Sequence, residues 1–142
     1  MITREPIYAA LFAKLSAAAK FKTVDRVLRH WVDVTASEQP ALFQSQRFED
    51  AATIPGQPTV WMLRLDIYLY AHTGGDKKVS PGALLNPLID AVEAALAPDV
   101  VTGKCRLGGL VEHAWIEGSI DTDEGTLGDQ AVAIVPIVIK AV

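Results

Sequence analysis

The chain has 142 residues, of which 50% are hydrophobic and 21% are charged, and its formal net charge is −4. This length and apolar content exclude a disordered protein and favour one domain with a single core, spanning residues 1–142. The negative charge balance argues against a basic groove that neutralises nucleic-acid phosphates. The apolar surplus also suggests a surface that is reserved for a partner.

The first third of the chain predicts one helix and several weaker elements. Thr3 can act as an N-cap and Pro6 suits a first helical turn, and the apolar residues that follow at helical spacing predict a helix through Ala18. Residues 21–34 carry both β-branched and helically spaced apolar side chains, and we favour a strand there. Further predictions are a loop at 35–40, a short extended segment at 41–46 and a second loop at 53–58.

The rest of the chain has stronger patterns. Strict alternation of apolar residues over 61–70 predicts a strand with one face in the core, followed by an exposed loop at 72–78. Ser80 and Pro81 predict the start of a second helix, which restarts at Pro87 and ends at Pro98. Residues 110–122 and 130–140 are predicted to form a β-hairpin with a long acidic connection. Together these elements predict an α+β fold, in which two main helices pack on a mixed or antiparallel β-sheet.

The last predicted strand has no polar face. Residues 131–139 are apolar on both sides, so the strand either lies in the centre of the sheet or is covered by a partner. We therefore predict a subunit interface at Val135, Ile137 and Ile139. Pro136 interrupts this run, which is also far shorter than the roughly 20 residues of a membrane-spanning helix. No membrane insertion is expected.

No segment has the spacing of a catalytic, cofactor or metal site. Gly103-Lys104 lacks the earlier glycine of a phosphate-binding loop, and the histidines lack metal-ligand spacing. Residues 121–125 resemble a calcium loop with glycine in the wrong place; a solvated turn is favoured, and a weak divalent-cation site stays open. Cys105 has no base near it in sequence. We expect no enzyme, no cofactor and no metal, and the single cysteine and the absence of a leader pattern favour a reducing cytoplasm.

Several segments, taken together and in order, carry a resemblance to one protein family. They are Phe21-Lys22-Thr23-Val24, Leu28-Arg29-His30-Trp31, Leu84-Leu85-Asn86-Pro87-Leu88, Gly109-Leu110-Val111, Trp115-Ile116-Glu117-Gly118 and Leu127-Gly128-Asp129-Gln130-Ala131. In this combination the chain resembles the tail terminator (tail completion) proteins of long-tailed bacteriophages and prophages, the group that includes the minor tail protein U of lambda-like phages. The resemblance implies a homohexameric ring on the head-proximal end of the tail tube, which ends tube growth and offers a surface to the head–tail connector. It implies no catalytic residues.

The partners expected from this resemblance are other copies of the chain, the tail tube protein, the connector, and DNA that passes through the lumen without specific binding. The expected location is the virion tail, assembled in the bacterial cytoplasm. We predict that the tube or connector is contacted by Lys77 and Lys78 and by the weakly patterned segment 35–58. The acidic connection is predicted to face the lumen, with an ordinary solvated turn on the outer rim as the alternative. Its carboxylates are Asp121, Asp123, Glu124 and Asp129.

Two other classes of function remain open. One is a small-molecule binding module or an enzyme, with a pocket near His113 and Trp115 that the sequence does not reveal. The other is a different phage structural role, as a connector or a tube subunit. A ring of several subunits would favour assembly, whereas a tight monomer with a deep polar pocket would favour binding.

Overall fold

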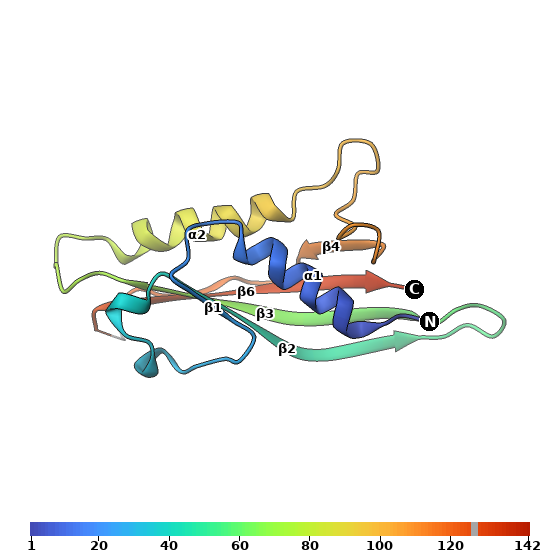
Figure 1. The fold of residues 1–142 in the computed structure, drawn as a ribbon, viewed down its shortest axis with the longest axis horizontal. Coiled ribbons are helices and arrows are strands. Elements are labelled where there is room, and N and C mark those ends of the chain that lie inside the picture. Colours follow the sequence, from blue (N-terminus) through green and yellow to red (C-terminus); the bar gives the residue numbers. More distant parts are fainter. Residues whose placement is uncertain (126–127) are drawn as a thin grey trace.

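Two α-helices and a six-stranded mixed sheet make up the structure, a computed structural model that describes residues 1–125 and 128–142. This confirms the predicted α+β class. In chain order the elements are α1 (Arg4–Ser16), β1 (Thr23–Asp25), the short 3-10 helices η1 (Trp31–Asp33) and η2 (Ala36–Glu38), β2 (Ala41–Ala52), β3 (Val60–His72), α2 (Pro81–Ala95), β4 (His113–Ile116), β5 (Asp121–Asp123) and β6 (Gln130–Ala141) (Figure 1).

The strands are ordered β1-β2-β3-β6-β4, and β5 also pairs with β6. Among the described strands, the β1–β2 pair is parallel and the other pairs are antiparallel. β6 therefore lies inside the sheet, with β3 along one edge and β4 and β5 along the other. The β2–β3 hairpin extends past both chain termini at one end of the molecule (Figure 1).

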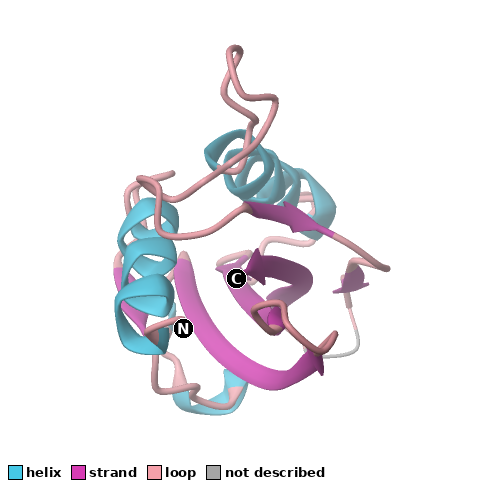
Figure 2. Ribbon diagram, turned by 90° about the vertical axis from the view of Figure 1, so that its right-hand side faces the viewer, coloured by secondary structure: helices cyan, strands magenta, loops and turns pink. Residues whose placement is uncertain are grey.

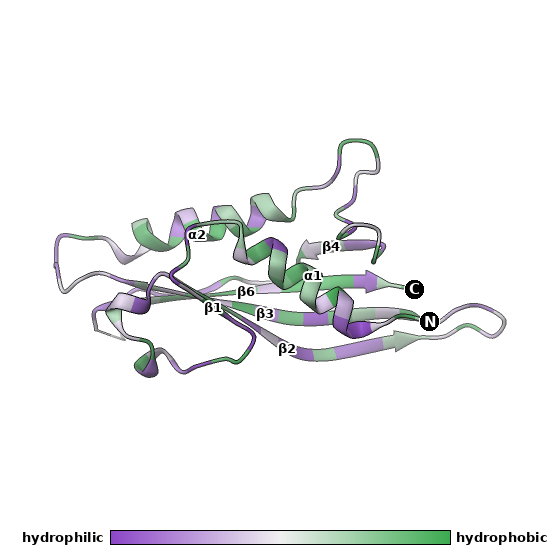
Figure 3. Cartoon of the chain, viewed as in Figure 1, coloured by the Kyte–Doolittle hydropathy of each residue, from purple (hydrophilic) through white to green (hydrophobic). Residues whose placement is uncertain are grey.

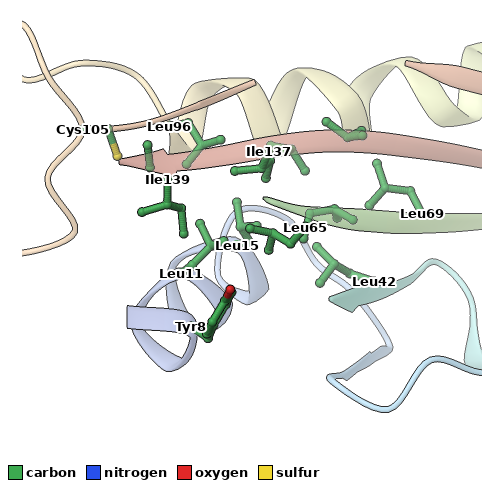
Figure 4. Packing of buried hydrophobic residues seen from close by; sticks show 14 of the residues in the cluster. Tyr8, Leu11, Leu15, Leu42, Leu65, Leu69, Leu96, Cys105, Ile137 and Ile139 are labelled. Atoms are coloured by element: carbon green, nitrogen blue, oxygen red, sulfur yellow. The ribbon is translucent and has the colours of Figure 1, made fainter. Parts of the chain in front are cut away.

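The main core lies between the two helices and one face of this sheet. Alternating residues of β3, Leu63 to Leu69, are at most 1% exposed, as the strict period-two pattern predicted. Figure 4 shows Leu11 and Leu15 of α1 pointing toward Leu65, with Ile137 and Ile139 of β6 close by. Burial of each such side chain stabilises the fold by about 1.5–3 kcal/mol.

Within residues 1–125 and 128–142, the opposite face of the sheet is covered at one end only. There a second, smaller cluster forms around Phe43, Tyr70 and Val132, and Trp31 of η1 packs against it. The Tyr70 hydroxyl donates a hydrogen bond to the Arg29 carbonyl at 2.7 Å, and burial raises the pKa of Tyr70 to about 12. At the other end of this face Phe48 remains 48% exposed.

The predicted strand at 21–34 is largely wrong. Only Thr23–Asp25 pairs, because the Asp25 carboxylate then accepts hydrogen bonds from the backbone N–H groups of Arg26 and Val27 and turns the chain. The residues that follow cross the far face of the sheet and cover the second cluster. Their mixed pattern reflects this covering role.

The short extended segment predicted at 41–46 is instead a long strand, β2. Its pairing with β3 continues to Ala52 after a register shift between Gln46 and Phe48, where Arg47 is one extra residue. Figure 3 shows that the middle of β2 is mostly hydrophilic, which is why hydrophobicity alone did not reveal the full length of the strand.

Two further boundaries differ from the prediction. α2 begins as expected, with the Ser80 hydroxyl accepting a hydrogen bond from the Ala83 N–H at 3.3 Å, but it runs through Pro87 without restarting and ends at Ala95. The strand predicted over 110–122 is broken into β4 and β5. Gly118, with φ of 108°, lies between them in a conformation that favours glycine.

Candidate assembly surfaces

Val135, Ile137 and Ile139 point to the helix-covered side of β6 and are 0%, 1% and 0% exposed. Since β6 is a central strand, its two-sided apolar pattern is explained within the chain, which is the first of the two alternatives that the sequence allowed. A neighbouring subunit could reach these side chains only by displacing the helices. These three side chains are therefore not exposed for a contact with another subunit.

Lys77 and Lys78 lie on an exposed turn, residues 73–80, which we call the lysine turn. The Asp76 carboxylate accepts a hydrogen bond from the Lys78 N–H at 2.9 Å. This bond gives the turn a defined backbone while both ammonium groups face solvent.

The acidic turn, residues 121–125 and 128–129, lies beside the lysine turn. The Thr73 N–H and hydroxyl both donate to the Asp129 carbonyl, at 2.8 and 3.0 Å, and Lys77, Glu124 and Asp129 line one shallow hollow. Leu127, which belongs to one of the segments that carry the family resemblance, lies outside the described residues. The two surfaces predicted for different tasks thus share one end of the molecule.

The acidic turn also affects the pKa of a carboxylate on the open face of the sheet, the face that the two helices do not cover. Burial raises the pKa of Asp66, an effect that nearby Arg47 opposes and the charge of Asp121 reinforces. Arg47 lies 3.4 Å from the Asp66 carboxylate.

Most of segment 35–58 is not the irregular binding loop that the sequence suggested, because residues 41–52 form β2. The outer half of β2 is held by polar contacts on the open face of the sheet. Arg64 of β3 pairs with Asp50 at 3.1 Å and with Glu117 at 3.2 Å, and its guanidinium lies 5.7 Å from the centre of the Phe48 ring. Only the hairpin tip at 53–59 is a projecting loop.

A groove of about 720 Å³ runs between α2 and β4, and we call it the α2–β4 groove. The pocket expected near His113 and Trp115 is found here, with the two rings stacked at 5.0 Å between centroids. Sequence reasoning missed the other wall, which comes from α2. The lining residues are Asp90, Glu93, Ala94, Leu96, Ala97, Pro98, His113, Trp115, Ile116 and Ile120.

The fold brings Cys105 close to His113, which was not predicted from the sequence. The Cys105 N–H donates to His113 Nδ1 at 3.0 Å, and the Ala114 N–H donates to the Cys105 carbonyl at 2.8 Å. Both bonds use the Cys105 backbone, and the residue is 5% exposed among core side chains (Figure 4). This arrangement fixes the loop against β4 rather than presenting a nucleophile.

Within residues 1–125 and 128–142, no three or more His, Cys, Asp or Glu side chains are grouped so that they could hold a metal ion. In the same residues there is no helix with the length and apolar character needed to cross a membrane.

No known family model matches the chain, and no curated protein matches its sequence. Its fold is similar to that of a chain in a solved structure described as the virion of a native gene transfer agent particle. The two chains are 14% identical, with a TM-score of 0.55, and the similarity covers 94% of this chain and 92% of the other. At this identity the similarity establishes a shared fold that spans nearly both chains.

Proposed function

We propose that the chain is a structural protein of a phage-like virion and that it acts as a tail terminator. In this proposal a ring of subunits, six by the family resemblance, caps the tail tube, ends its polymerisation and provides the surface that joins the head connector. The observation that carries the proposal is the similarity over 94% of the chain to a subunit of a virion particle. The sequence resemblance to tail terminators supports the more specific role.

The charged end of the molecule supports a place near the tube and the lumen. The lysine turn and the acidic turn lie side by side there, so one end offers cations to the tube or connector and carboxylates to the DNA path. A polyanion slides most freely past a wall with few cationic contacts. Phage carrying Lys at Asp121, Asp123 and Glu124 should therefore assemble normally but eject DNA more slowly; normal ejection would remove these residues from the lumen wall.

Electron microscopy of the purified protein, alone and mixed with tail tubes, tests the proposal directly. We expect closed rings and tubes that carry a ring at one end. A protein that stays monomeric at high concentration, both with and without tubes, would overturn the proposal.

Small-molecule binding is a second candidate because the α2–β4 groove exists. Trp115 lines it, so a ligand that enters should change the tryptophan emission. A monomer whose emission shifts with a small ligand, and which leaves tail tubes uncapped, would favour this candidate over assembly.

A further inference from the structure

Two opposite sides of the subunit differ in shape and charge. The strand order places β1 and β4 at opposite edges of the sheet. α1 lies on the β2 side, where the Tyr8 hydroxyl donates to Glu49 at 3.0 Å and the Gln44 amide donates to the Tyr8 carbonyl at 3.0 Å. In Figure 2, α1 is accordingly on one side of the molecule and the β4–β5 edge on the other. A ring needs two such different surfaces on each subunit.

The first surface is the outer side of α1, which we call the α1 ridge. Ala9, Ala13 and Ala17 are exposed and follow one another at about one helical turn, so this part of the ridge is smooth and apolar. Glu5, one turn before Ala9, is exposed and forms an ion pair with Arg26. Lys14 borders it and Lys20 follows the end of the helix. Among the described residues neither ammonium group has an ion-pair partner.

The second surface is the α2–β4 groove. Its floor is apolar, with Trp115, Ile116 and Ile120, whereas Asp90 and Glu93 of α2 stand exposed on its rim. In the described part of the chain neither carboxylate takes part in an ion pair. An apolar floor with an acidic rim suits a narrow apolar ridge that carries cations.

We propose that the α1 ridge of one subunit docks in the α2–β4 groove of the next copy, with Lys14 and Lys20 facing Asp90 and Glu93. This inference rests on the proposed function and names the surfaces that build its ring. The contact is head to tail, so every subunit contributes one ridge and one groove, and repetition closes a ring when the rotation between neighbours closes. Opposite charge selects the ridge–groove pairing over groove–groove or ridge–ridge pairing.

Two charge-reversed variants test this contact. Variant A carries Asp90→Lys and Glu93→Lys, and variant B carries Lys14→Glu and Lys20→Glu. Each variant alone places like charges across the contact and should associate about 100-fold more weakly than the wild type. A mixture of A and B should assemble again, because each altered surface complements the altered surface of the other variant. Native mass spectrometry should then find rings with equal numbers of A and B.

Controls separate a docking effect from a folding effect. Circular dichroism should show that A and B fold as the wild type does, and Asp33→Lys in η1, on the other face of the sheet, should assemble normally. If A or B fails to fold, Ala13→Arg decides: Arg is well tolerated in an exposed helix but should block the ridge and leave folded monomers.

The outcomes also distinguish this inference from the proposed function. A and B that form rings by themselves, or a mixture that stays monomeric while the wild type forms rings, would overturn the ridge–groove contact alone. A wild-type protein that stays monomeric with and without tail tubes would overturn both.

Discussion

On the helix-covered side of the sheet, β3 and β6 present continuous rows of apolar side chains to α1 and α2. On the other side the chain covers only one end, with Trp31 packed on a small cluster, and the rest is held by pairs such as Arg64–Asp50 and Arg64–Glu117. The first side therefore carries most of the stability. The second side can change its surface chemistry at a much lower cost in folding free energy.

The largest effect should come from a charge on the helix-covered side. Val135→Asp places a carboxylate where no partner or water can reach it, and we expect a loss of about 4 kcal/mol or more in the free energy of unfolding. The product should be unfolded or insoluble. Val100→Asp, on a fully exposed loop residue, is the matched control and should melt as the wild type does. A soluble, folded monomer from Val135→Asp would mean that this side is less tightly covered than the structure indicates.

A smaller effect is expected on the other side of the sheet. Tyr70→Phe keeps the ring in the second cluster but removes the hydrogen bond to the Arg29 carbonyl, and it should cost about 1 kcal/mol in urea unfolding. Phe43, whose ring lies 5.4 Å from that of Tyr70 in a tilted arrangement, should stay buried, so the far-UV circular dichroism should change little. A loss as large as that of Val135→Asp would contradict the division of stability between the two sides.

A weaker, pH-dependent effect is expected at the edge of the covering segment. A hydrogen bond from the Arg29 side chain, helped by the Thr35 N–H, lowers the pKa of Glu38 from 4.5 to about 2. A depressed carboxyl pKa stabilises the fold above the unfolded value, and this stabilisation is lost as the pH falls from 4.5 toward 2. Glu38→Gln should therefore differ from the wild type at neutral pH and converge with it in acid. NMR titration of the Glu38 carboxyl checks the pKa itself, and a midpoint near 4.5 would refute the explanation.

The smallest effect on stability belongs to the lysine turn. Lys77→Glu with Lys78→Glu should leave the melting temperature unchanged, because both side chains are exposed. The same change should weaken joining of heads to tails in a reconstitution assay if this turn contacts the tube or connector. Unchanged joining would remove the turn from that contact.

The sequence predicted the elements whose signals are local. Alternation from Trp61 to Leu69 identified both a strand and its buried face, and Ser80 with Pro81 identified the start of α2. The outer half of β2 was missed because the alternation breaks at Arg47, and its pairing depends on distant residues of β3. The segment after Asp25 was wrongly predicted to be a strand. Its apolar residues instead cover a patch around Phe43, Tyr70 and Val132, which forms only when the chain folds.

For the candidate surfaces too, features that depend on contacts between distant parts of the chain could not be predicted from the sequence. His113 and Trp115 were named from the sequence only as residues near a pocket in an alternative function, and they line the α2–β4 groove. Asp90 and Glu93 were not named, since nothing in the sequence shows that α2 lies beside β4. The burial of Val135 likewise depends on the helices that pack over that face of β6, which is a property of the whole fold.

Arg47 is the extra residue of a β-bulge in β2. After it, odd-numbered residues face the helices in place of even-numbered ones. Before it, even-numbered residues such as Leu42 and Gln44 point toward the helices; after it, odd-numbered Glu49 does, and there it accepts the Tyr8 hydroxyl. If the same residues paired one for one without this bulge, Arg47 would pair with Arg64, and the two faces of the outer half of the strand would exchange, bringing Phe48 under α1 and Glu49 into solvent. In this protein, the bulge at one position determines which side chains the outer half of β2 presents to the helices and which to the far face.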